Sequence, residues 1–155
     1  MNWSFNTPAY WEDEFAGKDQ DHYFLNEDIC FIDGKDFFVR GVIEIPVIDG
    51  DQTFGYGVWV SLSKENFKKY VEVFGTKKEL KEKPYFGWLS NQLSWYPDTL
   101  GIKTHVHLQG NKLRPKIELD HDNAHPLCQE QHNGITMERV HEIIGVIEKD
   151  RLSYE

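Results

Sequence analysis

The chain has 155 residues, of which 39% are hydrophobic and 28% charged, and its 26 acidic and 17 basic side chains give a net charge of −9. This length suits one domain with its own core, so we expect residues 1–155 to form a single domain. The acidic excess removes the electrostatic attraction that drives nucleic-acid and anionic-membrane binding, and no apolar run is long enough to span a bilayer.

The cysteines and the N-terminal residues indicate a compartment. Cys30 and Cys128 are too few and too far apart for a zinc-binding pair or a disulfide framework. The first residues lack the basic start and the apolar stretch of a signal peptide. We therefore expect a cytoplasmic protein with both thiols reduced and buried. Cys128 lies between His125 and His132, which leaves a nucleophilic role open, although buried structural thiols are far commoner.

The N-terminal residues 1–25 are rich in aromatic side chains without a clear period, so we predict an arm packed on the main body. Its large side chains are Trp3, Phe5, Tyr10, Trp11 and Phe15.

Two alternating runs, 37–47 and 54–62, predict half-buried strands, and the turn Asp49-Gly50-Asp51 between them predicts a hairpin. Matching their apolar faces pairs Ile45 with Tyr56 and Ile43 with Val58.

Two segments after this hairpin are predicted to be helical. Ser63 is a suitable N-cap for a helix from Lys64 to Phe74, and Gly75 ends it. The aromatic segment 84–97 is interpreted as a short helix between loops.

A second hairpin is predicted where residues 101–109 and 113–119 alternate around Gly110-Asn111, a favoured two-residue turn. This turn pairs Val106 with Pro115, whose missing N–H suits an edge strand or a bulge. A last helix is predicted from Thr136 to about residue 149. The fold class is therefore α+β: an antiparallel sheet of two β-hairpins packed with about two to three helices.

The second hairpin carries an H-x-H pair, His105 and His107, whose side chains share one face and can reach a single ion. Further ligands for a zinc-like ion follow in the sequence, namely Asp120, His121, His125 and His132. The predicted register, however, surrounds the pair with cations that oppose metal binding: Arg114 beside His107, Lys116 beside His105, and Lys103 on the same face. A metal site stays an alternative, and we predict no metal and no other cofactor.

The same side chains permit a different interpretation. Together they form a positive strip on an acidic molecule, which could bind a phosphate or carboxylate ligand: Lys103, His105, His107, Arg114 and Lys116. An ordinary solvated sheet face is the other interpretation.

The first hairpin offers a second candidate cleft. Arg40 and Glu44 share one face of the first strand, and Gly55 and Gly57 lie on the facing strand near Trp59. Glycines beside a tryptophan can leave a concave space, and the Arg–Glu pair would supply polar contacts. Alternatively, the glycines mark a bulge and Arg40–Glu44 is a structural ion pair, which we favour.

Several blocks occur together along the chain: Phe38-Val39-Arg40-Gly41, Glu44-Ile45-Pro46-Val47, Gly57-Val58-Trp59-Val60-Ser61-Leu62-Ser63, Tyr85-Phe86-Gly87-Trp88-Leu89, Tyr96-Pro97-Asp98-Thr99-Leu100, Arg114-Pro115, Ile117-Glu118-Leu119 and His125-Pro126-Leu127. In this order they resemble an uncharacterised bacterial family, domain of unknown function 2199. The resemblance implies a shared fold and no particular reaction. Many relatives begin with a cysteine pair suggestive of a zinc knuckle, whereas this chain has no cysteine before Cys30.

The sequence favours a binding function over catalysis. It contains no P-loop, no dinucleotide-binding fingerprint, no nucleophile elbow and no H-E-x-x-H motif. We therefore predict a non-enzymatic binding or accessory protein, with Tyr10-Trp11 and the segment 88–96 as contact sites. An acidic, immunity-type partner of a basic protein is one version. The alternative is an enzyme or small-ligand protein that binds an anion or a metal near Arg40, Glu44, Trp59, His105 and His107.

Overall fold

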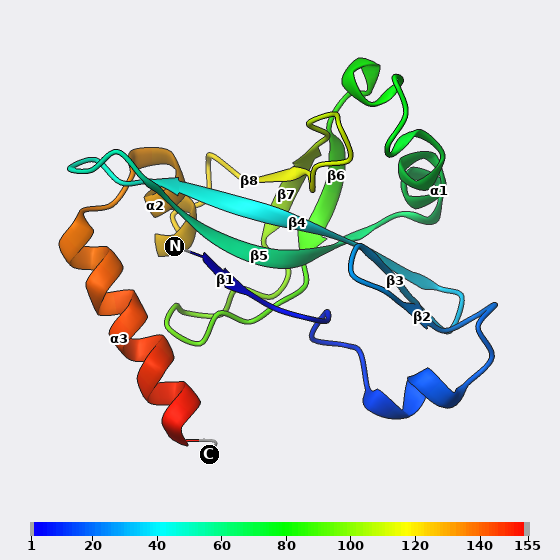
Figure 1. The fold of residues 1–155 in the computed structure, drawn as a ribbon, viewed down its shortest axis with the longest axis horizontal. Helices are drawn as coiled ribbons and strands as arrows, with labels where there is room; N and C mark the ends of the chain where they lie inside the picture. The colour runs from blue at the N-terminus through cyan, green and yellow to red at the C-terminus, as the bar shows by residue number, and fades with distance from the viewer. Residues whose placement is uncertain (1, 154–155) are drawn as a thin grey trace.

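A five-stranded β-barrel forms the centre of the computed structural model, which describes residues 2–153 and the side chains of residues 3–150 (Figure 1). Its strands are β4 (Asp36–Pro46), β5 (Thr53–Leu62), β6 (Tyr85–Leu89), β7 (Lys103–His107) and β8 (Lys116–Leu119). Neighbours along the chain pair antiparallel, and a parallel contact between β4 and β8 closes the circle. The α+β class is confirmed, but the predicted sheet of two hairpins is wrong because its ends join.

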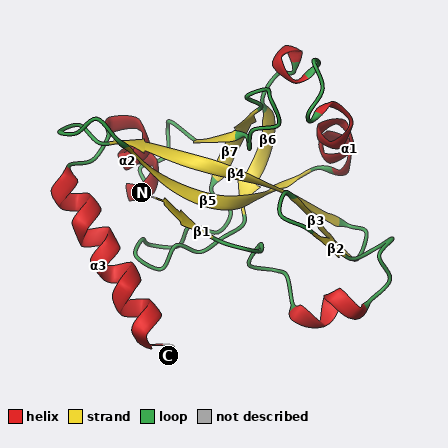
Figure 2. Cartoon of the chain, in the orientation of Figure 1, coloured by secondary structure: helices red, strands yellow, loops and turns green. Residues whose placement is uncertain are grey.

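Three further strands extend the barrel (Figure 2). β1 (Asn2–Ser4) pairs in parallel with β5, whereas β3 (Ile29–Ile32) pairs with β4 and β2 (Phe24–Leu25) pairs with β3. The 3₁₀ helix η1 (Asp13–Gly17) precedes β2. The predicted arm therefore contributes strands to the sheet as well as packing on it.

The first hairpin forms, but its register differs from the prediction by two residues. Ile43 faces Tyr56 and Ile45 faces Phe54. A shift of two residues keeps every side chain on its predicted face, so the apolar pattern alone cannot detect it. The connection between the strands spans residues 47–52.

The second hairpin is shifted in the same way. Val106 faces Ile117, His105 faces Glu118, and His107 faces Lys116. The predicted two-residue turn is wrong, because the connection spans residues 108–115. Asn111 and Lys112 adopt positive φ angles of 56° and 62° within this longer loop.

The helices fit the predictions in part. α1 (Lys64–Val73) begins after Ser63, whose hydroxyl accepts a hydrogen bond from the Asn66 amide, as predicted. A short 3₁₀ helix, η2 (Glu79–Lys81), follows. α3 (Met137–Ser153) confirms the last helix. The predicted helix within 84–97 is wrong, since its first part is β6, and α2 (Pro126–Asn133) was not predicted. No helix in the described part of the chain is long and apolar enough to cross a membrane.

Closure of the barrel depends on Gly41. A Cβ atom at this position would lie 2.6 Å from Cδ1 of Ile117 and 2.8 Å from the carbonyl oxygen of Pro115. The Val42 amide donates to that same carbonyl at 2.9 Å. The absence of a side chain therefore lets β4 approach β8.

The buried residues form two clusters on opposite faces of β4. The main core fills the barrel and extends to α1, α2 and α3. A smaller cluster, formed by Cys30, Ile32, Phe38 and Trp59, lies beneath the aromatic side chains of the arm. Cys128 belongs to the main core, and both thiols are free and buried, as expected. Burial raises the pKa of Cys30 to about 12 and that of Cys128 to about 11.

Candidate functional sites on the barrel surface

The structure divides the predicted site residues among separate places. Arg40 and Trp59 are buried, Glu44, His107 and Lys116 line one pocket, and Arg114 points to Asp28. Lys103 and His105 are exposed on β7 opposite Trp88 and Phe86 of β6.

The Arg40 side chain contacts Trp59 of β5 and the Glu27 backbone before β3. Its guanidinium carbon lies 5.6 Å from the centre of the Trp59 ring, and its Nη1 donates to the Glu27 carbonyl at 3.3 Å. Burial and the nearby Arg114 lower the pKa of Arg40. The predicted Arg40–Glu44 ion pair is wrong, because Glu44 instead lies 3.4 Å from Nζ of Lys116.

The predicted hollow beside the glycines of β5 is filled by β1. Ser4 faces Gly57 in the parallel pairing, and a Cβ atom on Gly57 would lie 2.5 Å from the Ser4 hydroxyl oxygen. The Trp59 indole N–H donates to the Phe5 carbonyl at 3.0 Å, which fixes the arm over this strand. In the described part of the chain, β1 therefore occupies the side of β5 where the cleft was predicted.

A pocket of about 400 Å³ lies where β7 and β8 meet α2, and we call it the histidine pocket. Its lining residues are Glu44, His107, Lys116, Ile117, Glu118, Gln131 and His132. The Gln131 side chain accepts from the Leu119 amide and donates to the Ile117 carbonyl, both at 2.7 Å. It thus binds the edge of β8 as a neighbouring strand would, and it fixes α2 against the barrel.

Glu118 connects His107 of the histidine pocket to His121, which lies outside the pocket lining. One carboxylate oxygen lies 3.2 Å from Nε2 of His107, and the other lies 3.1 Å from Nε2 of His121. Burial raises the pKa of Glu118, but these two hydrogen bonds outweigh it and the pKa falls below its ordinary value. The predicted positive strip differs in composition: Glu118 stands opposite His105, and Arg114 lies outside the paired residues of β7 and β8.

The residues proposed from the sequence as metal ligands, all of which the structure describes, do not converge on one ion site. Among the residues that the structure describes, no group of three or more His, Cys, Asp or Glu side chains is arranged to hold a metal ion. The rings of His121 and His132 lie with their centres 3.8 Å apart and their planes tilted by 31°, and Nε2 of His132 donates to the Leu119 carbonyl at 3.0 Å.

A larger hollow of about 510 Å³ lies on the outer face of β4, β5 and β6, and we call it the aromatic groove. Its lining residues are Tyr10, Ile32, Asp36, Phe38, Ser61, Trp88, Leu89, Ser90 and Gly101. Tyr10 and Trp88 are 52% and 44% exposed, although 77 residues separate them in the sequence. Tyr10 stacks on buried Phe38 at 6.0 Å, and Trp88 packs against exposed Phe86 at 4.9 Å.

The two segments predicted as contact sites thus meet at this groove. Sequence reasoning missed its floor and its shape, because β6 was interpreted as a helix. In Tyr85-Phe86-Gly87-Trp88-Leu89 the burial alternates and Phe86 and Trp88 point outward, but both faces are apolar, so the sequence shows no period of two.

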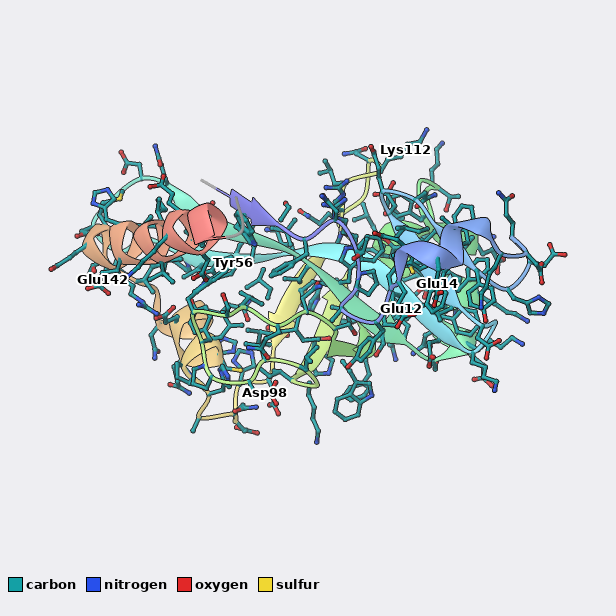
Figure 3. All side chains as sticks on the ribbon, turned by 90° about the horizontal axis from the view of Figure 1, so that it is seen from below. Glu12, Glu14, Tyr56, Asp98, Lys112 and Glu142 are labelled. Carbon is teal, nitrogen blue, oxygen red and sulfur yellow. The ribbon has the colours of Figure 1, made fainter. Side chains whose placement is uncertain are left out.

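Negative charge is concentrated in the segment 12–36, which contributes Ile32 and Asp36 to the groove lining. Residues 12–36 contain nine acidic side chains against two lysines, whereas the whole chain has a net charge of −9. Figure 3 shows Glu12 and Glu14 at η1. A hydrogen bond with Glu14 and the repulsion between the two carboxylates raise the pKa of Glu12. One carboxylate of this acidic segment, that of Asp36, thus lines the groove itself.

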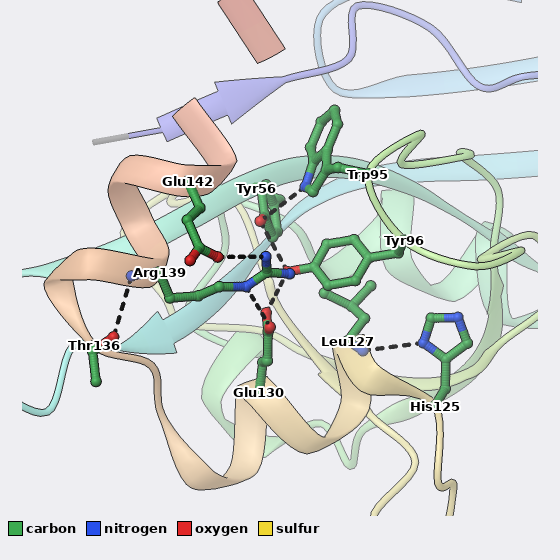
Figure 4. Close-up of polar contacts among 9 residues, drawn as sticks. All are labelled: Tyr56, Trp95, Tyr96, His125, Leu127, Glu130, Thr136, Arg139 and Glu142. Carbon is green, nitrogen blue, oxygen red and sulfur yellow. Dashed lines mark hydrogen bonds and ion pairs between the residues drawn. The ribbon is translucent and has the colours of Figure 1, made fainter. Parts of the chain in front are cut away.

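A further polar network holds α3 on the main body (Figure 4). Glu130 of α2 accepts from the Tyr96 hydroxyl at 2.5 Å and from Nε of Arg139 at 2.8 Å. Tyr56 lies 3.0 Å from the Tyr96 hydroxyl and accepts from Trp95 at 3.1 Å. Burial raises the pKa of Tyr96 and raises that of Tyr56 to about 12. These groups satisfy one another, so the network serves the fold.

Comparison with known families now places the chain. The family described as "Uncharacterized protein conserved in bacteria (DUF2199)" matches residues 1–135. The chain belongs to this family. The resemblance drawn from the sequence blocks is thereby confirmed, and α3 lies after the matched residues. No curated protein and no solved structure matched the chain.

Proposed function

We propose that this protein is a non-enzymatic binding protein that engages a basic protein partner at the aromatic groove. The observation that carries the proposal is that Tyr10 and Trp88, from distant parts of the chain, line one hollow and expose about half of their surface there. Tryptophan and tyrosine are enriched among the residues that contribute most to binding at protein interfaces.

The energetics of the groove favour this role. The ring of Phe38 forms a buried floor beneath Tyr10, so the exposed ring is held by stacking before a partner arrives. A side chain that is ordered in the free protein loses little conformational entropy on binding. A partner that covers Trp88 and Phe86 would also remove exposed apolar surface from water.

The charge beside the groove favours a basic partner. Nine acidic residues in the segment 12–36 attract a positively charged protein over several ångströms and raise the rate of encounter, an effect that salt screens. An immunity-type inhibitor of a basic toxin is one concrete version of this function. The cytoplasmic location expected from the sequence fits it and stays a prediction.

The test begins with capture at low salt from a bacterial extract, followed by purification of the captured protein and measurement of its affinity. We expect Trp88→Ala and Tyr10→Ala each to weaken binding at least about ten-fold, as hot-spot residues do. The exposed Leu80, which lies outside the groove lining, gives the matched control Leu80→Ala. Capture of background only, or an affinity that ignores both aromatic substitutions and salt, would contradict the proposal.

A second candidate function is favoured by the histidine pocket. A carboxylate that orients an imidazole is an arrangement used in general acid–base catalysis, and Glu118 orients His107 at the wall of a cavity of small-molecule size. Lys116 and His107 would supply positive contacts to a small anionic ligand. A thermal-shift screen with phosphate and organic acids tests it, because a ligand of the native state raises the melting temperature. A response lost in His107→Gln would support this candidate, and no response would reject it.

A further inference from the structure

A third cavity lies on the arm side of the molecule, between η1 and β2, and has a volume of about 350 Å³. Three aromatic side chains line it together with one carboxylate: Trp11, Tyr23, Phe24 and Asp13. The aromatic side chains are partly buried and Asp13 is exposed. We call this hollow the arm cavity.

The rings beside the arm cavity form one packed cluster. Trp11 meets Phe15 edge to face with ring centres 5.5 Å apart, and Phe15 packs against Tyr23 at 5.1 Å. Phe15 thus joins Trp11 and Tyr23, and the third lining ring, Phe24, stacks on Phe31 at 5.5 Å, so packing fixes the orientations of all three. Trp11 and Tyr23 also pack against the smaller buried cluster beneath the arm.

An ammonium group already lies against these rings. Nζ of Lys18 is 5.5 Å from the centre of the Phe15 ring and 5.1 Å from that of the Tyr23 ring. Both distances fall within the range in which the negative face of an aromatic ring attracts a cation. Lys18 thus shows that these rings can hold an ammonium group.

The carboxylates around the arm cavity also favour a positively charged ligand. Asp13 is part of its lining, and the Tyr23 hydroxyl donates to Asp33 at 3.3 Å. That carboxylate, together with Asp19, contributes to raising the pKa of Tyr23, behind the larger effect of burial. Aromatic rings combined with carboxylates favour a cation over an anion or a neutral ligand.

From the cavity, its rings and the placement of Lys18 we infer that the arm cavity binds an alkylammonium group. The inference rests on the proposed function only for the source of that group, which would be a lysine side chain of the basic partner. Tyr10 lines the aromatic groove and its neighbour Trp11 lines the arm cavity, so the two sites adjoin at the arm. A partner lying across the arm would place an apolar side chain in the aromatic groove and an ammonium group in the arm cavity.

The experiment titrates the full chain with three small molecules and follows the indole N–H signals by NMR. The ligands are n-butylammonium, which mimics lysine, choline, which is a quaternary ammonium, and 3,3-dimethylbutan-1-ol, the neutral isostere of choline. We expect at least one cation to bind about ten-fold more tightly than the neutral alcohol, a ratio within the range of desolvated cation–π contacts. Tighter binding of butylammonium identifies a lysine as the source, and tighter binding of choline identifies a quaternary ammonium ligand.

Charge variants make the test sharper. Asp13→Asn is expected to weaken cation binding while leaving the neutral alcohol unaffected, whereas Asp51→Asn, on the distant β4–β5 turn, changes neither. Lys18→Met removes the competing ammonium and is expected to tighten cation binding about two- to three-fold, on the scale of an exposed cation–π contact. Lys68→Met on α1 removes the same charge elsewhere and serves as its control.

Two outcomes would overturn the inference. One is equal binding of choline and its neutral isostere, and the other is the absence of a saturable response to either cation. Trp11→Phe keeps a ring in place and should retain weakened cation binding, which separates loss of the site from loss of the fold. This titration needs no partner protein, so its failure would not contradict the proposed binding at the aromatic groove. Likewise, failure of the capture experiment would not contradict ammonium binding in the arm cavity.

Discussion

The histidine pocket and the aromatic groove are two hollows on the outside of one barrel, of about 400 and 510 Å³. In the histidine pocket the polar groups are already paired within the chain, as Glu118 with His107 and Lys116 with Glu44. A ligand there must replace existing interactions. In the aromatic groove the outer faces of Tyr10 and Trp88 remain exposed to water, so a partner adds contacts without breaking any. This difference is why we place binding at the groove.

The largest expected effect concerns the floor of the groove. Phe38 is 2% exposed and supports the Tyr10 ring, so Phe38→Ala should lower the free energy of unfolding by about 3–4 kcal/mol through lost burial and a cavity. Urea denaturation measures it. A loss below about 1 kcal/mol would mean that the floor can collapse and that the groove is not preformed.

The next effect concerns the strand contact beneath the histidine pocket. Gly41→Ala places a methyl group against Ile117 and the Pro115 backbone and should cost about 2 kcal/mol. Gly145→Ala is the matched control, because Gly145 lies in α3 with no atom within 4 Å of the added methyl group. The control should gain about 0.5–1 kcal/mol from helix propensity. Equal effects of the two substitutions on the urea midpoint would disprove close packing at Gly41.

A smaller effect is expected at the wall of the groove. Trp88 is 44% exposed and its ring packs against the exposed ring of Phe86, so Trp88→Ala should cost no more than about 1 kcal/mol. We expect the Trp88→Ala variant to have melting and urea curves near those of the original chain but to lose partner binding. This result would show that Trp88 serves binding, whereas Phe38 serves stability. A cost as large as that of Phe38→Ala would show instead that the wall is part of the core.

The smallest effect is a pH dependence in the histidine pocket. The folded-state pKa of Glu118 lies below its ordinary value of 4.5, so its ionised form is favoured by folding. This stabilisation is present above pH 4.5 and is lost as the pH falls through the lower, folded-state pKa. Because the Glu118 side chain is 38% exposed and solvent screens its interactions, this stabilisation should be under about 1 kcal/mol.

Urea midpoints measured from pH 7 to pH 3 for Glu118→Gln check this expectation. The Glu118→Gln variant should lose less stability on acidification than the original chain. The control Glu148→Gln on α3 should lose as much as the original chain. An identical acid profile for all three proteins would contradict the assigned direction.

The sequence predicted local elements better than their pairing. Alternation located β4, β5, β7 and β8, yet both hairpin registers were wrong by two residues, since a shift of two preserves every face. β6 was missed because Phe86 and Trp88 make its outer face apolar, which hides the alternation. α2 carried a usable signal, with Pro126 in its first turn and His125 accepting from the Leu127 amide as its cap.

Of the candidate sites, the sequence identified some side chains but not their neighbours. The contact of β4 with β8 joins residues 42 and 116 and depends on loops that follow no periodic pattern. It brings Glu44 to Lys116, whereas Arg40 lies four residues away along the same strand, so the predicted Arg40–Glu44 pair does not form. Tyr10 and Trp88 were identified as contact residues, but that they line one groove follows only from the position of the arm.

The two buried thiols can be used to measure local opening of the fold. Cys30 lies beneath the arm and Cys128 in the main core on the other face of β4, and with pKa values of about 12 and 11 neither reacts while it stays covered. The rate at which a thiol reagent modifies each one therefore measures how often its covering segment lifts away. Comparing Cys30→Ala with Cys128→Ala assigns the two rates, and shows whether the arm detaches while the barrel stays closed.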